Sequence, residues 1–339
     1  MWKSFSERGC DVTARPTIRD VAIEAGVGIS TVSKALNHGA GSPEVLARVN
    51  EAAARLGYRP SRQAAGLRRG STGRIGVLIP DLANPVFVAY LRGVESVARS
   101  RGRSVQVADG QGTTAETEAA LRQLTNEQVD GVVLAGPVPA ALVKEVREAG
   151  IAVLPDATRD RAHLRAWSDA EVAATRDLVA RLIGLGHRCF AWVVPASSSR
   201  QRRAFRPARY DAFVAAVEAA GGVVEVVLVP IGEPPVDVPE VLRGATAVIC
   251  GSQAVAPLVL RWLREDSRRV GRDVSVAAYG DSPWTLAVDP PLAVVRHDTW
   301  AEGADAATAL IDRLEGRPDA ARATPTASFV DRPSIGKAR

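Results

Sequence analysis

The chain has 339 residues, enough for two or three domains and a sizeable hydrophobic core. Hydrophobic residues make up 46% of it and charged residues 24%, which excludes a mainly disordered chain. Three widely spaced cysteines, Cys10, Cys189 and Cys250, argue against a disulfide framework or a cysteine zinc site and fit a reducing compartment. No apolar run is long enough to span a membrane, and the N-terminal residues lack the apolar core of a signal peptide, so we expect a cytoplasmic protein.

The net charge of +5 is unevenly distributed along the chain. Residues 1–70 hold 11 Lys+Arg and 6 Asp+Glu, whereas the remaining residues hold 32 of each. A basic front on a neutral body predicts an anionic partner for the front alone. A basic disordered tail is the alternative. We expect disorder only for residues 1–14, because the residues that follow carry helix signals.

Residues 15–60 show the pattern of three short helices. A capping-box-like start at residues 17–20 opens the first helix, which stops at Gly26. The second covers residues 31–36, and the third runs over residues 42–57, with Ser, Pro and Glu at its start. Two short helices joined by a glycine-containing turn are typical of a helix-turn-helix, whose second helix can enter the major groove of DNA.

The segments TIRDVAIEAGVGISTVSKALN and LGYRPSRQAAGLRRG resemble the DNA-binding headpiece of the LacI/GalR family of bacterial transcription regulators. The resemblance implies that double-stranded operator DNA is the partner and that Ile29, Ser30 and Lys34 read base edges. Gly28 departs from the family, which usually has a serine there that caps the recognition helix and contacts a phosphate. The other DNA-contacting positions implied by the resemblance are Thr17, Thr31, Ser33, Asn37, Ser42, Tyr58 and Ser61.

Residues 61–73 indicate a basic linker with a short helix over residues 61–69. The resemblance implies a hinge helix that folds on the operator, with Leu67 wedged into the minor groove and Ala64 facing it. Gly66 weakens such a helix by roughly 1 kcal/mol relative to alanine, which favours folding only on binding. A plain flexible linker is the alternative.

From residue 74 onward, short apolar strands alternate with amphipathic helices, which is typical of a parallel sheet covered on both faces. The pattern predicts two similar α/β lobes with a ligand cleft at the carboxyl ends of their strands. We expect strands over residues 75–80, 104–108, 131–135, 151–154, 189–194, 223–229, 247–250 and 274–279. We expect helices over residues 87–100, 114–126, 140–149, 172–185, 210–220 and 256–265.

The segments IGVLIPDLANPVFVAYLRGVE, VDGVVLAG, LIGLGHR, DVSVAAYGD and DPPLAVVRHD extend the resemblance over nearly the whole body. They imply a periplasmic-binding-protein-like core in which the chain passes three times between two lobes. We expect these passages near residues 155–159, near residues 282–284 and after Gly316. The core would then cover residues 74–339, with the first lobe at about 74–155 and 285–316 and the second at about 157–281 and 324–339.

The resemblance also implies that a small metabolite, a sugar or sugar phosphate, binds between the lobes and adjusts operator affinity. The effector-binding positions implied are Phe87, Asp169, Arg200, Arg206 and Asp281. This chain departs from the family at three places: Ser252-Gln253 replace the usual Asn-Asp, Gly280 replaces an acid, and Arg209 replaces glycine. Five arginines between residues 200 and 209 suit an anionic effector better than a neutral sugar, and a solvated basic loop is the alternative.

We expect a homodimer on a pseudo-palindromic site, with the helix around residues 87–97 as the interface implied by the resemblance. The four histidines show no metal-ligand spacing, and the chain has neither a phosphate-binding loop nor a nucleophile elbow. The expected function is therefore a DNA-binding regulator, a repressor without a metal, a cofactor or catalysis. A stand-alone solute-binding protein and a two-domain sugar-phosphate enzyme are the alternatives.

Overall fold

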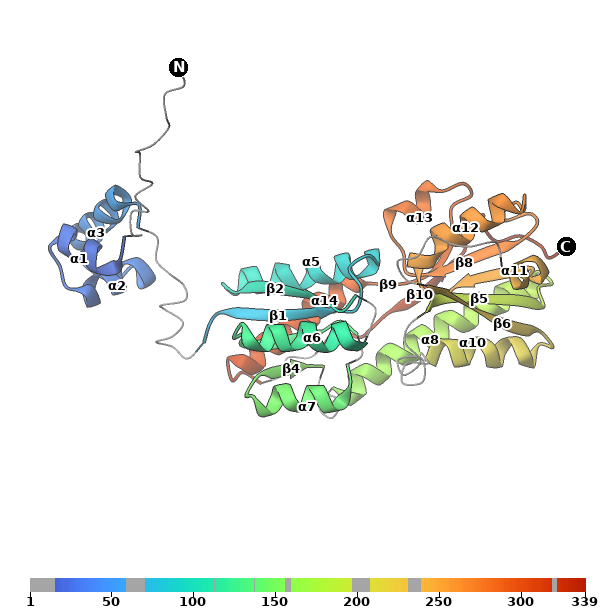
Figure 1. The fold of residues 1–339 in the computed structure, drawn as a ribbon, viewed down its shortest axis with the longest axis horizontal. Coiled ribbons are helices and arrows are strands. Elements are labelled where there is room, and N and C mark those ends of the chain that lie inside the picture. Colours follow the sequence, from blue (N-terminus) through green and yellow to red (C-terminus); the bar gives the residue numbers. More distant parts are fainter. Residues whose placement is uncertain are drawn as a thin grey trace, which may run out of the picture. The chain divides into compact units, whose positions relative to one another are not determined.

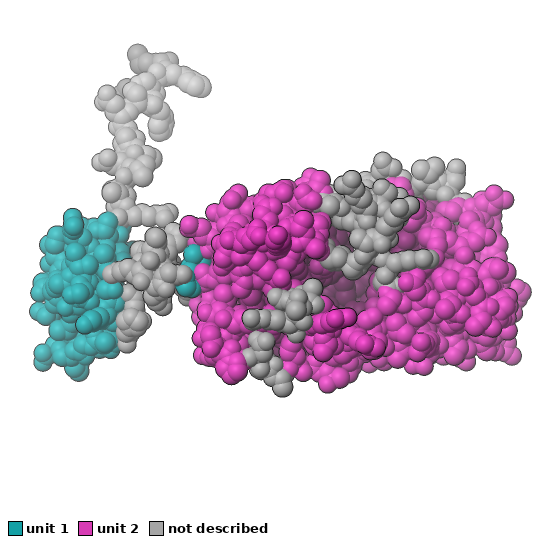
Figure 2. Space-filling view, turned by 90° about the horizontal axis from the view of Figure 1, so that it is seen from below, with its two compact units in different colours: residues 1–72 teal, residues 73–339 magenta. Residues whose placement is uncertain are grey.

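The computed structural model describes residues 16–58, 71–111, 114–136, 138–155, 160–196, 208–230, 239–318 and 322–339. The chain forms two compact units, residues 1–72 and 73–339, drawn in teal and magenta in Figure 2. The expected extension over residues 1–14 and the hinge positions Ser61, Ala64 and Leu67 lie outside the described residues. Within the described ranges, no helix combines the length and apolar character that a membrane span requires.

The described residues of the first unit form three helices, drawn in blue in Figure 1: α1 (Ile18–Ala25), α2 (Ile29–His38) and α3 (Pro43–Leu56). Val21, Val32 and Val49 contribute one fully buried side chain from each helix, and small alanines surround them. The buried side chains of this core are all valine or alanine, and larger ones such as Leu36 and Tyr58 pack against it only partly buried, so the core is compact but modest in area. The helix-turn-helix predicted from the sequence is present.

The helix ends follow from local residue chemistry. The Thr17 hydroxyl accepts a hydrogen bond from the Asp20 amide at 3.4 Å, and the Thr17 amide donates to the Asp20 carboxylate at 2.7 Å, so the capping box is complete. Gly26 ends α1 with a φ of 62°, a conformation that favours glycine and turns the chain into α2 within three residues. Helix α2 begins at Ile29, two residues before the expected start, and its N-cap Gly28 offers no side-chain cap.

The second unit contains a four-stranded parallel sheet in the order β2-β1-β3-β4. Its strands are β1 (Arg74–Ile79), β2 (Ser104–Asp109), β3 (Gly131–Leu134) and β4 (Ala152–Leu154). Helices α5 (Pro85–Ser100) and α14 (Thr299–Leu314) cover one face, while α6 (Thr114–Asn126) and α7 (Ala140–Glu148) cover the other (Figure 1). Strands β1 and β3 are buried on both faces, which explains their largely apolar sequences.

A six-stranded sheet in the order β10-β9-β8-β7-β5-β6 forms the other lobe of this unit. Its strands are β5 (Cys189–Ala196), β6 (Val223–Pro230), β7 (Ala247–Cys250), β8 (Ser275–Tyr279), β9 (Ala293–His297) and the antiparallel β10 (Ala327–Val330). Its helices are α8 (Arg161–Gly184), α10 (Ala208–Ala219), α11 (Glu240–Gly244), α12 (Ala256–Glu265) and α13 (Pro283–Ala287), with a short 3-10 turn over Gln253–Val255.

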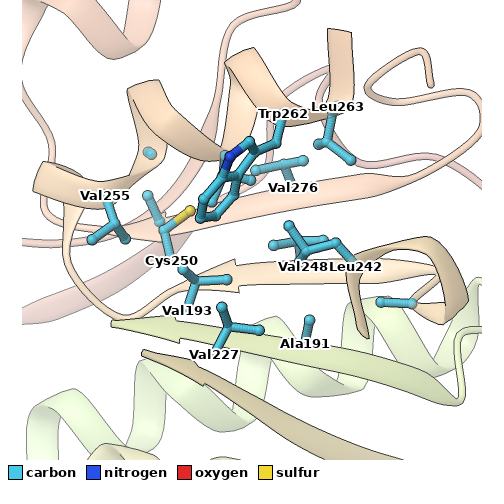
Figure 3. Close-up of a cluster of buried hydrophobic side chains, with 14 of the residues drawn as sticks. Ala191, Val193, Val227, Leu242, Val248, Cys250, Val255, Trp262, Leu263 and Val276 are labelled. Carbon is cyan, nitrogen blue, oxygen red and sulfur yellow. The ribbon is translucent and has the colours of Figure 1, made fainter. Parts of the chain in front are cut away.

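Side chains alternate between the two faces of this sheet, as they do along any strand. Ala191 and Val193 of β5 lie in the cluster that packs against Trp262 of α12 (Figure 3). Phe190 and Trp192 lie in the cluster that contains the buried residues of α8 and α10. Two apolar layers therefore enclose the sheet, and its carboxyl edge is left for polar side chains.

The second passage between the lobes lies elsewhere than the sequence indicated. We expected it near residues 282–284, but α13 and β9 both belong to the second lobe, because β9 pairs in parallel with β8. The chain crosses at Asp298, which caps α14, so residues 285–297 belong to the second lobe rather than the first. Segment Ala293–Val295 is fully buried in the second-lobe core, which is the physical reason for the difference.

Helix α8 spans both lobes and is longer than the predicted helix over residues 172–185. Just before its start, Asp160 pairs with Arg313 of α14 in the first lobe at 2.6 Å. Towards its end, Leu178 and Leu182 are buried against the second sheet. No residue in the first half of α8 is buried, and the sequence pattern there did not predict a helix, so its helical state depends on these tertiary contacts.

Candidate nucleic-acid interface and interlobe site

The three positions expected to read bases share the exposed side of α2. Ile29, Ser30 and Lys34 are exposed, and 40% of Ile29 is accessible although it is a large aliphatic residue. Thr31 and Ser33 are half-buried beside them, while Val32 and Ala35 face the core. The surface thus combines an aliphatic side chain, short hydroxyls and one cation, the chemistry that suits a thymine methyl, phosphates and a base edge.

Several other residues expected to contact DNA already form hydrogen bonds or packing contacts within the first unit. The Thr17 hydroxyl lies 2.8 Å from the Asp20 carboxylate, to which it donates, and the Ser42 hydroxyl accepts from the Val45 amide at 3.4 Å. Both residues remain exposed at the start of a helix, and Tyr58 packs against the hydrophobic core as a half-buried ring. The side chain of Asn37 and all of Ser61, Ala64 and Leu67 lie outside the described residues.

The charge of the front end is not carried by the three helices. Residues 16–58 hold four basic and four acidic residues, and Arg55 pairs with Glu24 at 3.3 Å and with Glu51 at 3.9 Å. Four arginines without any acid stand instead between residues 59 and 70, in the segment expected to be the hinge. The helical unit therefore offers shape and polar groups, and the following segment supplies the positive charge.

A second polar cluster lies at the carboxyl ends of β7 and β8, the edge where parallel sheets bind ligands. Arg209, at the start of α10, donates to the Glu171 carboxylate of α8 and, at 2.9 Å, to the carbonyl oxygen of Gly251. The guanidinium carbon stands 4.6 Å from the centroid of the Tyr279 ring. The side chains of Arg209 and Glu171 are only 22% and 16% exposed, so the pair is largely shielded from water.

This cluster adjoins the first lobe. Asn84, the N-cap of α5 in the first lobe, donates through Nδ2 to the Ser252 hydroxyl at 3.3 Å. Gln253, 1% exposed, accepts a hydrogen bond from the Ser282 hydroxyl through Oε1. Ser252 and Gln253 stand where the family usually has Asn-Asp, and both side chains already have hydrogen-bond partners. The partner of Ser252, Asn84, belongs to the other lobe.

Three ionisable groups surround this cluster. Burial lowers the pKa of His297, and its ring stands edge-on to Trp167 with 5.1 Å between centroids. Burial, together with the charges of Glu171 and Asp298, raises the pKa of Glu302 to about 9, so this carboxyl is neutral at pH 7. Asp298, where the chain crosses between the lobes, and Glu302 therefore share one electrostatic environment with Glu171 of the Arg209–Glu171 pair.

Asp281 was expected to bind the effector, but it is held by the protein. Arg332 donates to both of its carboxylate oxygens, at 3.0 and 2.7 Å, and the Thr285 hydroxyl donates at 2.6 Å. Burial acts to raise the pKa of Asp281, but the hydrogen bonds from Arg332 and Thr285 outweigh it and lower the pKa. An open groove of about 650 Å³ passes Asp281 and His297, and its lining includes neither Arg209 nor Glu171.

The remaining effector candidates are dispersed. Phe87 is half-buried against the first-lobe core. Asp169 is 70% exposed and lies 3.7 Å from Arg165 on the same helix, so it stands on an open face of α8. Arg200 and Arg206 lie outside the described residues. Glu171, His297 and Glu302 were not anticipated, because their roles depend on three elements that are distant in sequence.

Three family models match the chain. Residues 17–61 match the bacterial regulatory proteins of the lacI family, residues 72–238 the periplasmic binding proteins and sugar binding domain of the LacI family, and residues 179–335 a periplasmic binding protein-like domain. The HTH-type transcriptional regulator PtxS of Pseudomonas putida is 30% identical over 327 residues, which cover 91% of this chain and 92% of PtxS.

The chain belongs to the LacI family. Another LacI-family relative, the HTH-type transcriptional regulator KdgR of Bacillus subtilis, is 26% identical over 318 residues, covering 90% of this chain and 93% of KdgR. The solved Lac repressor dimer bound to operator and an anti-inducer shares the fold, with a TM-score of 0.73, 22% identity and coverage of 95% of this chain and 99% of that one. The predicted headpiece and periplasmic-binding-protein-like core are thus confirmed as the fold of this LacI-family chain.

Proposed function

We propose that this LacI-family chain regulates transcription, as a repressor, by placing α2 in the major groove of an operator. The observation that carries the proposal is the exposed face of α2, where Ile29, Ser30 and Lys34 lie on a helix fixed by a capped three-helix core. Hydroxyls and a lysine on one exposed helix face can combine phosphate contacts with base readout. The relatives named as HTH-type transcriptional regulators support this role over catalysis.

The operator complex would contain two copies of the chain on a pseudo-palindromic site. One recognition helix reads one half-site, so a dimer is the natural reader of two half-sites about one helical turn apart. Arginines between residues 59 and 70 add the phosphate-neutralising charge that the helical unit lacks. Leu67 and Ala64 remain the candidates for the minor groove at the centre of the site.

The two-lobe core would sense a small metabolite and pass its binding on to the operator-bound state. Arg200 and Arg206 remain candidate effector contacts, together with Phe87 at the first-lobe side. Asp169 is exposed beside Arg165 and Asp281 is engaged by Arg332, so an effector contact at Asp281 would have to displace Arg332. An effector that binds the two arrangements of the lobes unequally shifts the balance between them and so changes operator affinity. The change it causes in the free energy of operator binding equals the change that the operator causes in the free energy of effector binding.

Fluorescence anisotropy with duplex DNA from upstream of the chain's own gene tests the proposal. The full chain is expected to bind one sequence there with a salt-sensitive affinity at least about a thousandfold above its affinity for scrambled DNA. Equal affinity for operator and scrambled DNA at every salt concentration would contradict the proposed function.

A further inference from the structure

Arg209 has an unusual setting for a residue that replaces glycine. Its guanidinium is fixed on two sides by groups that do not exchange, the Gly251 carbonyl oxygen and the face of the Tyr279 ring. Its third partner, the Glu171 carboxylate, comes from a different helix and is an anionic group in its own right. The pair therefore resembles a bound anion on a prepared guanidinium, with the anion supplied by the protein.

The position of this pair is the ligand edge of the lobe. Gly251, which accepts the hydrogen bond from Arg209, directly precedes Ser252, which accepts one from Asn84 of the first lobe. Tyr279 ends β8, and His297 ends the neighbouring strand β9. The guanidinium consequently lies at the carboxyl ends of the central strands, next to a contact between the lobes.

The unpaired polar atoms of this edge are nitrogens. Among the described residues, Arg209 Nε, Gln253 Nε2 and His297 Nδ1 are buried without a hydrogen-bond partner. Two side-chain oxygens of this edge are already engaged, since Gln253 Oε1 accepts from Ser282 and the Ser252 hydroxyl accepts from Asn84. Gly280, where the family has an acid, adds no side-chain acceptor. The edge therefore suits a ligand rich in acceptor oxygens.

Among the described residues, the charges beside Arg209 are balanced by one anion. Glu171 already places a negative charge beside Arg209, and that charge contributes to keeping Glu302 neutral. An additional anion beside an unmoved Glu171 would be repelled by it and by Asp298. An anion that takes the position of the Glu171 carboxylate leaves the local charge unchanged.

We propose that Glu171 holds the place of the effector's anionic group, and that a metabolite bearing a carboxylate or a phosphate binds by replacing the Glu171 carboxylate on Arg209. Arg209 and Glu171 are then the specificity-determining residues at this edge of the sheet, and neutral sugars bind poorly because they offer no charge to exchange. This inference rests on the proposed function, since it concerns the metabolite that the core senses.

Chemical rescue in the full chain tests the exchange without knowledge of the effector. In Glu171→Ala, the guanidinium loses its anion, and acetate or inorganic phosphate is expected to bind at least about tenfold more tightly than to the unchanged chain. At an anion concentration about tenfold above its dissociation constant, the melting temperature should rise by about 2–4 °C beyond sodium chloride of equal ionic strength. Acetate and phosphate are separate arms, and the stronger one identifies the anionic group.

Three further variants keep the test decisive. Glu171→Gln retains the shape of the side chain and serves if Glu171→Ala does not fold. Glu171→Ala combined with Arg209→Met should show no anion effect, and Glu265→Ala, which frees Arg261 on the exposed face of α12, should show none either. The proposal is overturned if both anions act no better than chloride on both Glu171 variants, or if the double variant responds equally. Operator binding is measured in a separate experiment. Loss of specific DNA binding would contradict the proposed function, whereas the anion measurements test only the exchange at Arg209.

Discussion

A Cβ atom at residue 280 would lie 2.9 Å from Nε2 of Gln253, so the side chain of Gln253 occupies the space that an acid at position 280 would need. Gln253 is almost fully buried, and Gly280 has a φ of 100°, a conformation that favours glycine. Two departures from the family pattern, glutamine for aspartate and glycine for an acid, are therefore parts of one local arrangement at the carboxyl end of β8.

Gly280→Asp is expected to destabilise the core rather than restore a ligand contact. Backbone strain at a positive φ and the contact with Gln253 should together lower the free energy of unfolding by about 1–3 kcal/mol. Urea denaturation measures the loss. Combining the change with Gln253→Ala removes the contact but not the strain, so stability should return only in part. A fully stable Gly280→Asp chain would show that the two residues are independent.

Lys34→Ala should separate base reading from general DNA binding. Lys34 is exposed on α2, and loss of a base contact costs about 1–3 kcal/mol of operator affinity while nonspecific affinity falls far less. Fluorescence anisotropy on operator and scrambled DNA gives both values. Lys144→Ala, which removes an exposed lysine from α7, is the matched control and should leave both affinities unchanged. Equal losses on the two DNAs would assign Lys34 to phosphate contact only.

Arg332→Met should destabilise the second lobe, because it leaves the Asp281 carboxylate without its bidentate partner. The two side chains are 11% and 18% exposed, and losing one member of such a pair costs about 2–4 kcal/mol at neutral pH. The pKa of Asp281 is lowered in the folded chain, so its stabilisation is present above its ordinary value of 3.8 and is lost as the pH falls below it. Urea denaturation should therefore show that the difference in free energy of unfolding between variant and parent becomes smaller as the pH is lowered. The double variant Arg332→Met with Asp281→Asn should recover part of the lost stability at neutral pH.

Glu302→Gln should stabilise the chain at alkaline pH. The folded pKa of Glu302, about 9, lies above its ordinary value of 4.5, so the folded chain binds the extra proton between these values and stability falls as the pH rises through them. A glutamine cannot titrate, and the variant should exceed the parent by about 1–3 kcal/mol near pH 8 and match it near pH 4. Urea denaturation across this range tests the slope. Identical slopes would place the Glu302 carboxyl in water.

Much of the fold could be predicted from the pattern of apolar residues and from helix-capping residues. The buried strands β1, β3 and β7 are continuous apolar runs, and the capping residues Thr17 and Ser42 mark two helix starts. The patterns failed where helix formation depends on distant partners, as in the first half of α8, and where β9 joins the second sheet rather than the first lobe.

The sequence by itself determined the helix-turn-helix and the alternation of strands and helices, since these depend on spacing along a single element. The resemblance to the family, rather than spacing, indicated Ile29, Ser30 and Lys34 as the base-reading positions. Only the tertiary structure decided that Arg209 pairs with Glu171, that Arg332 holds Asp281, and that Asn84 reaches Ser252 across the lobes. Each of these contacts joins residues from elements that are far apart in the chain, and their partners are chosen by packing and charge in three dimensions rather than by local pattern.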